Sequence, residues 1–179
     1  MLVAAIEDEA NRVLIANRAL VARLAAERKR FEDWLRLEVF KVLMLQRTCL
    51  EIEKSYPNSK ERCDFWSCEP GEPENWVEVK LCVTNYCNDF TGAVSSRPIT
   101  NQISDIQRDI EKLGRLPRET CRAILFAAYP MPRDYRSHSA WGAHISSIKS
   151  CAPSIEERFE VPLQRNGKSA SVVGYRITL

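Results

Sequence analysis

Residues 62–80, RCDFWSCEPGEPENWVEVK, contain the pattern that decides the fold. The stretch begins and ends with runs that alternate in polarity, which predicts two strands, and EPGEP between them has the composition of a loop. Residues two apart on a strand project from the same face, so Glu78 and Lys80 point together while Val79 points away. If the two strands pair as a hairpin, Asp64 lies across from Glu78.

This arrangement predicts a metal site. Two carboxylates held close together repel each other unless a cation lies between them. A hard divalent ion such as Mg²⁺, or Mn²⁺ in its place, prefers such oxygen ligands and keeps several waters. Asp64 and Glu78 are therefore expected to bind the ion, with the carbonyl of Val79 as a further ligand. Lys80 is expected to orient or deprotonate an attacking water, or to stabilise charge on a phosphate.

A third acid is expected from the helix that precedes these strands. At about 100° per residue, Glu38 lies near the middle of one apolar sector of this helix. The apolar members of the sector are Phe31, Trp34, Leu35, Val42, Leu45 and Cys49. A carboxylate on a packed face is costly unless it is paired or binds a metal, so Glu38 is favoured over Glu32 at the sector's edge. The alternative is a simple ion pair between Glu38 and Lys41.

The first fifty residues contain neither Pro nor Gly and read as helix, with a break expected around residues 27–30. Residues 1–29 are expected to form a helical arm, and residues 30–179 the main domain. One stripe of the arm is apolar and includes Asn17; its other members are Val3, Ile6, Ala10, Val13, Leu20 and Leu24. The stripe predicts packing on the chain's own domain, or pairing with a second copy as a homodimer with Asn17 setting the register.

The order of elements predicts an α/β fold with a small mixed sheet flanked by helices. A short strand-like run ends near Pro57, before the two strands described above. A polar connection over residues 84–98 precedes the later elements. These are a helix over 99–113, a strand buried on both faces over 121–129, a helix over 140–149 and a closing strand over 169–179.

A helical Glu, a strand Asp64, and Glu78-Val79-Lys80 on the next strand resemble the PD-(D/E)XK nuclease superfamily, over roughly residues 30–130. The resemblance implies a restriction-endonuclease-like core and Mg²⁺-dependent endonuclease hydrolysis of nucleic acid, most often DNA. In such proteins the helix after the motif strands supplies polar or basic residues, which here are Gln102, Arg108 and Lys112. Cys63 stands where the family name has proline. The superfamily also has inactive members, so the alternative is a nucleic-acid-binding or assembly module of the same fold.

Other residues admit competing interpretations. Arg133 and Arg136 beside Tyr135 form a basic and aromatic cluster, either contacting phosphate or an unpaired base or lying in a solvated loop. The cysteine spacing C-x4-C-x13-C-x4-C predicts a zinc site or, more simply, free thiols. Its members are Cys63, Cys68, Cys82 and Cys87. His138 and His144 have no Ser or Cys placed as a triad, and Trp66, Trp76 and Trp141 are typical of core packing.

The charge balance limits how a nucleic acid is held. The net charge is only +2, from 26 basic and 24 acidic residues, so a nucleic-acid partner must be bound by a local basic surface. No apolar run approaches the roughly 20 residues that span a bilayer, and the N-terminus lacks the basic region of a secretory signal. We therefore expect a cytoplasmic protein with no membrane partner.

Overall fold

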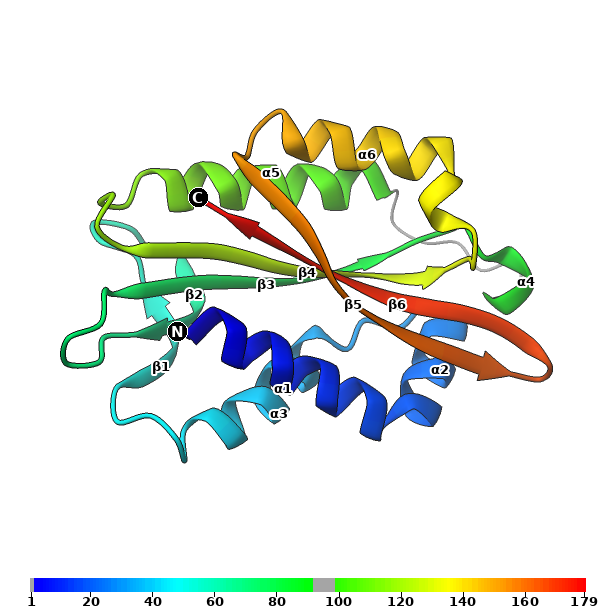
Figure 1. Ribbon diagram of the computed structural model, residues 1–179, viewed down its shortest axis with the longest axis horizontal. Coiled ribbons are helices and arrows are strands. Elements are labelled where there is room, and N and C mark those ends of the chain that lie inside the picture. The colour runs from blue at the N-terminus through cyan, green and yellow to red at the C-terminus, as the bar shows by residue number, and fades with distance from the viewer. Residues whose placement is uncertain (1, 92–98) are drawn as a thin grey trace.

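The computed structural model describes residues 2–91 and 99–179 and has an α/β architecture, with one mixed sheet between two layers of helices (Figure 1). In chain order the elements are α1 (Leu2–Ala16), α2 (Arg18–Ala26), α3 (Glu32–Leu43), β1 (Leu50–Ser55), β2 (Arg62–Ser67), β3 (Asn75–Val83), α4 (Asn88–Thr91), α5 (Ile99–Gly114), β4 (Cys121–Met131), the 3-10 helix η1 (Tyr135–Ser137), α6 (Ser139–Lys149), β5 (Ser154–Arg165) and β6 (Lys168–Thr178). The predicted mixed sheet flanked by helices is confirmed.

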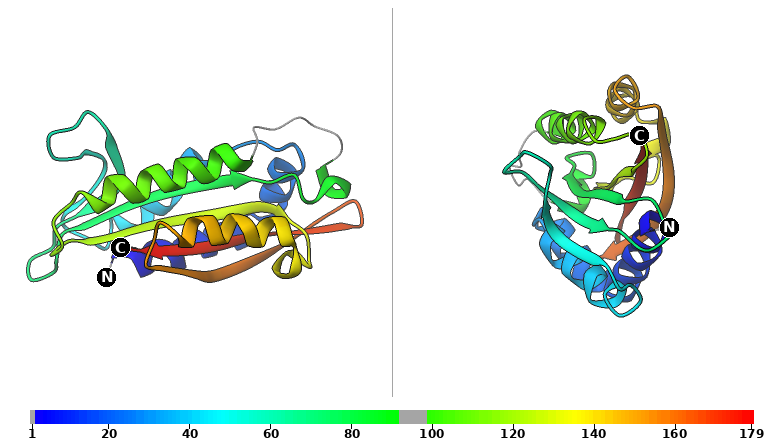
Figure 2. Two further views of the ribbon diagram at one scale, coloured as in Figure 1. Left: turned by 90° about the horizontal axis from the view of Figure 1, so that it is seen from above. Right: turned by 90° about the vertical axis from the view of Figure 1, so that its left-hand side faces the viewer.

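The sheet has six strands in the order β1-β2-β3-β4-β6-β5. Strands β3 and β4 pair in parallel, and every other neighbouring pair is antiparallel. The crossover between the two parallel strands contains α5, which lies with α6 on one face of the sheet, whereas α1, α2 and α3 cover the other (Figure 2). Each face of the central strands is therefore protected from water, as the uninterrupted apolar character of β4 predicts.

The alternation predicted for β3 is confirmed by the two hydrophobic cores. Val77, Val79 and Leu81 belong to the core beneath α1 and α3. Trp76 and Cys82 belong to the core beneath α5 and α6. Glu78 and Lys80 therefore project toward α5, on the side of the sheet where a carboxylate can meet residues of that helix.

The N-terminal helix differs from the expectation, because it breaks at Asn17 as well as before α3. The Asn17 side chain donates a hydrogen bond to the carbonyl of Val13 at 2.9 Å, which is a local contact that competes with helix continuation. Most of the apolar stripe is buried in the core that the helices form with the sheet, although Leu20 is 45% exposed. Residues 1–29 were expected to form an arm, and the two helices within them pack on the chain's own domain, which was the first of the two interpretations of the apolar stripe.

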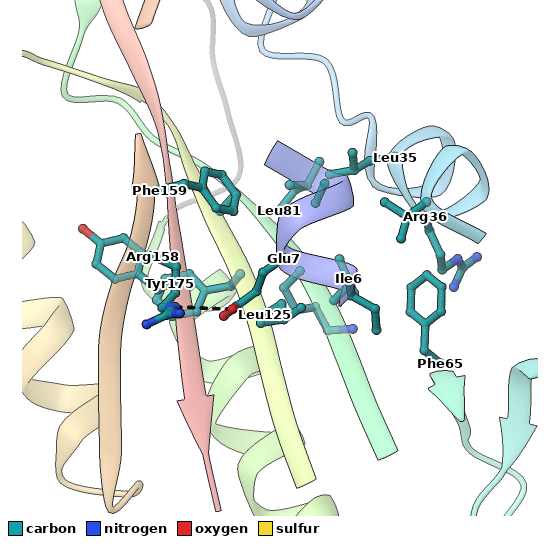
Figure 3. A pocket seen from close by; sticks show the side chains of 16 residues that line it. Ile6, Glu7, Leu35, Arg36, Phe65, Leu81, Leu125, Arg158, Phe159 and Tyr175 are labelled. Carbon is teal, nitrogen blue, oxygen red and sulfur yellow. Dashed lines mark hydrogen bonds and ion pairs between the residues drawn. The ribbon is translucent and has the colours of Figure 1, made fainter. Parts of the chain in front are cut away.

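Helix α1 is also held to the sheet by a buried carboxylate. Glu7 is 5% exposed and accepts hydrogen bonds from Arg158 and from Arg176, each at 3.3 Å. Figure 3 shows Glu7 directed toward Arg158, and both residues line an apolar pocket together with Ile6 and Leu125. Burial raises the pKa of Glu7, and the two guanidinium groups oppose that rise.

Strand β5, helix α4 and the 3-10 helix η1 were not expected. Strand β5 is an edge strand in which Phe159, Val161 and Leu163 face the core while the residues between them are exposed, and Pro162 within this run argues against a strand and obscures the alternation. The short helix α4 lies within the predicted irregular connection over residues 84–98, of which residues 92–98 lie outside the described part of the chain. Within residues 2–91 and 99–179, none of the helices is long and apolar enough to cross a membrane.

Candidate active site

The candidate site lies where the pairing between β2 and β3 ends. Backbone pairing between these strands ends at Phe65 and Val77, whereas β3 stays paired with β4 as far as Val83. The rest of the β3 edge that faces β2 therefore needs other hydrogen-bond partners, because buried backbone groups are costly to leave unpaired.

Side chains from three different elements supply those partners at alternate residues of β3. The acceptors are Asp64 Oδ2 for the N–H of Val79, Glu32 Oε2 for that of Leu81 and Gln102 Oε1 for that of Val83, each at 2.7 Å. Gln102 also donates from Nε2 to the carbonyl of Val83 at 2.8 Å. Alternate N–H groups point to the same edge of a strand, so the acceptors lie in a row along the opening.

The structure brings Asp64, Glu78 and Lys80 together, as the sequence predicts. The Lys80 Nζ lies 3.8 Å from Asp64 Oδ2, 3.6 Å from Glu78 Oε2 and 3.3 Å from Asp109 Oδ2. Lys112 on α5 completes the group, with its Nζ 2.7 Å from Asp109 Oδ1. We call these five residues the Lys80 cluster. Its three carboxylates converge on one ammonium from two strands and a helix.

Glu78 is the most deeply buried member of the Lys80 cluster, at 1% exposure. Its Oε1 accepts hydrogen bonds from the Tyr56 hydroxyl at 2.6 Å and from Lys112 at 3.3 Å. Burial, followed by the like charge of Asp64, raises the pKa of Glu78 to about 7. Burial acts to lower the pKa of Lys80, but the facing carboxylates outweigh it and the pKa is raised.

The expectation that Glu38 joins the acidic site is wrong, and Glu32 lies there instead. Glu38 pairs with Lys41 at 3.1 Å on the helix surface, which was the alternative interpretation. The prediction for Glu38 failed because it extended the helix too far. Helix α3 ends at Leu43, so Leu45, which is 84% exposed, lies beyond the helix and does not belong to its packed face. Glu32 is in the first turn of α3, against the open edge of β3, and burial raises its pKa.

The other predicted residues have mixed placements. Val79 donates its N–H to Asp64, and its carbonyl as a metal ligand stays a prediction. Gln102 caps β3, and Arg108 pairs with Asp105 at 3.4 Å near the Lys80 cluster. The predicted substrate contacts Arg133 and Arg136 lie elsewhere, by β5 and β6. Arg133 donates to Ser169 at 3.1 Å, and Arg136 pairs with Glu157 and Glu160.

Sequence reasoning missed Asp109, Tyr56 and Arg36. Asp109 is 4% exposed and lies on the buried stripe of α5 beside Ile106 and Ile110. A carboxylate on an apolar stripe is costly unless it is paired, so the periodicity of this helix could have indicated that Asp109 belongs to the site. Arg36 donates to Asp64 Oδ1 at 2.6 Å. Neither Tyr56 nor Arg36 carries a sequence signal, because each contact depends on how separate elements pack.

The four cysteines of the zinc hypothesis are not brought together. Cys63 and Cys82 lie in the core beneath α5, whereas Cys87 packs against the core on the opposite face and Cys68 is exposed. Burial raises the pKa of Cys82 to about 12. The two histidine rings pack around Tyr86, with centroid distances of 4.4 Å for His138 and 6.5 Å for His144.

The donor set of the Lys80 cluster fits a hard divalent ion in one respect. Asp64 and Glu78 both lie within 4 Å of the Lys80 ammonium, and Mg²⁺ is typically bound by one or two protein carboxylates with water completing its shell. Within the described ranges, no group of three or more His, Cys, Asp or Glu residues is placed to hold a metal. Metal binding by Asp64 and Glu78 stays a prediction.

Comparison of the chain with models of known families, with curated proteins and with solved structures gave no match. The resemblance to PD-(D/E)XK nucleases thus rests on this chain's own sequence motif and stays a prediction.

Proposed function

We propose that the protein is a metal-dependent nuclease of the PD-(D/E)XK type, with DNA as the expected substrate. The observation that carries the proposal is the position of the Lys80 ammonium within 4 Å of the carboxylates of both Asp64 and Glu78. The order of elements also supports a restriction-endonuclease-like core. An acidic residue from α3, Asp64 on β2 and the Glu78-Val79-Lys80 segment on β3 meet at one opening.

Each residue of the site has a distinct task in this proposal. Asp64 and Glu78 would hold Mg²⁺ or Mn²⁺, and such an ion would supply Lewis-acid activation of the phosphodiester. Lys80 positions the attacking water and offsets negative charge that develops on the phosphate. Arg36 and the N–H of Val79 fix the two oxygens of Asp64. Tyr56 fixes Glu78.

The test is a cleavage assay on supercoiled plasmid and on oligonucleotides with Mg²⁺, with Mn²⁺ and with EDTA. We expect metal-dependent cleavage that falls about 100-fold or more in Glu78→Gln and in Lys80→Met. The exposed pair Glu38 and Lys41 provides matched controls, because Glu38→Gln and Lys41→Met change the same residue types away from the site. Cleavage that persists in EDTA, or that survives both site substitutions, contradicts the proposal.

The second candidate is a non-catalytic nucleic-acid-binding or assembly module of the same fold. It is favoured by one observation: cations already neutralise the carboxylates, with Arg36 2.6 Å from Asp64 and Lys112 2.7 Å from Asp109. Such a module binds nucleic acid equally well with and without EDTA, and its affinity for nucleic acid is unchanged by Glu78→Gln. It cleaves nothing in the same assay.

A further inference from the structure

A hollow of about 520 Å³ lies beside the Lys80 cluster. One wall is the turn that joins β1 to β2, including Tyr56 and Ser59, and the other is the end of α5 with Lys112 and Arg115. We call this hollow the Arg115 pocket. Lys112 itself belongs to the cluster, and the Tyr56 hydroxyl donates a hydrogen bond to Glu78 Oε1, so the pocket directly adjoins the cluster.

A second hollow neighbours the Arg115 pocket and is lined in part by residues of the Lys80 cluster. Glu61 and Lys112 line both hollows, and the second one also contains Arg30, Glu32 and Lys80. The Arg115 pocket thus lies next to the hollow that the proposed catalytic groups line. A chain-like substrate that spans the two neighbouring hollows would place one unit in the pocket and the next bond near Lys80.

The chemistry of the Arg115 pocket suits a nucleotide. Arg115 is exposed and has no ion pair or side-chain hydrogen bond with the rest of the described chain, so its planar guanidinium is available for a phosphate. Pro57, Leu116 and Pro117 supply apolar surface against which a base can lie. Glu61 is the one acidic residue of the lining, against the two cations Lys112 and Arg115.

The size of the pocket limits what can enter. A volume of about 520 Å³ is within the range of roughly 300–1,000 Å³ typical of small-molecule sites, and it is walled on two sides. A base can enter such a pocket only after it leaves its stack and its pairing partner. A paired duplex therefore cannot place a base there.

We propose that the Arg115 pocket binds an unpaired nucleotide next to the phosphodiester to be cleaved, so that the substrate of this protein is a single strand or an unpaired end. The inference rests on the proposed nuclease function for the identity of the ligand. Arg115 holds the phosphate of that nucleotide, and the apolar wall contacts its base.

The test separates binding from cleavage by measuring fluorescence anisotropy in EDTA. The probes are a labelled DNA strand of about 12 nucleotides and the blunt duplex made from it. We expect the single strand to bind at least about 10-fold more tightly than the duplex, and Arg115→Ala to weaken single-strand binding about 10-fold. Because one phosphate contact is lost, the slope of log K against log salt should decrease by about 0.7 in Arg115→Ala.

Two further variants make the result specific to the pocket. Ser59→Trp fills the hollow from an exposed turn and should weaken single-strand binding without removing a charge. Arg118→Ala removes an exposed arginine three residues beyond Arg115 that does not line the pocket, and should leave binding unchanged.

The possible outcomes distinguish this inference from the proposed function. Equal or tighter binding of the duplex, or unchanged binding in both Arg115→Ala and Ser59→Trp, overturns the inference even if the protein cleaves DNA. Selective single-strand binding that depends on both Arg115 and Ser59 supports the inference. If none of the metals tested then produces cleavage of nucleic acid, the nuclease proposal fails and the binding inference stands.

Discussion

Replacing Glu78 with Gln should stabilise the folded protein at alkaline pH. Glu78 is 1% exposed, and its pKa rises from the ordinary 4.5 to about 7 on folding. A carboxyl whose pKa is raised binds its proton more tightly in the folded state than in the unfolded state. The stabilisation that this bound proton gives the folded state is complete below pH 4.5 and is lost as the pH rises through about 7.

The magnitude follows from the two pKa values. At about 1.36 kcal/mol per pKa unit, ionised Glu78 lowers the free energy of unfolding by at most about 3 kcal/mol above neutral pH. The Gln side chain resembles the protonated acid and avoids this cost. For a chain of this length the gain corresponds to a rise in Tm of roughly 6–12 °C at about pH 8.

Urea unfolding followed by tryptophan fluorescence measures the effect in EDTA, at about pH 8 and about pH 5. We expect Glu78→Gln to exceed the wild type at the higher pH and to approach it at the lower pH. Glu38→Gln, on an exposed ion pair, should change stability by less than about 1 kcal/mol at either pH. A Glu78→Gln protein that is no more stable than the wild type at about pH 8 refutes the argument.

Three further predictions concern the site and the sheet. Magnesium at about ten times its Kd should stabilise the wild type by about 1.4 kcal/mol, and Asp64→Asn should abolish that gain in a thermal melt. Tyr56→Phe removes a 2.6 Å hydrogen bond to buried Glu78 and should lower the free energy of unfolding by about 1–3 kcal/mol in urea titrations; an unchanged value would show that the bond contributes nothing. Gly174→Ala places a Cβ 2.3 Å from the ring of Phe159, and calorimetry should show a loss of about 1–3 kcal/mol unless the ring moves freely.

Much of the central sheet was predictable because its strands carry local patterns. The two faces of β3 belong to different cores, so alternation of Val79 with Glu78 and Lys80 is visible in the sequence. The same pattern predicted the convergence of Asp64 on Glu78. The edge strand β5 escaped detection because Pro162, which cannot donate a backbone hydrogen bond, stands within the alternating run of Phe159, Val161 and Leu163.

The choice of Glu38 over Glu32 on α3 shows what the sequence could not predict. The apolar sector that favoured Glu38 included residues beyond Leu43, where the helix ends without a Gly or Pro to mark the position. Glu32 was recognisable only from its contact with Leu81, a residue 49 positions away. Contacts of that range depend on packing between elements, which periodicity within one element does not report.

The row of acceptors along β3 has a consequence for how the protein behaves in solution. An open strand edge is a template on which another chain can add a strand and aggregate. Asp64, Glu32 and Gln102 occupy the N–H groups of that edge, so the same residues that form the opening also block intermolecular strand addition. Truncating them to Ala would expose the template, and turbidity or light scattering would then reveal self-association in variants made only to abolish activity.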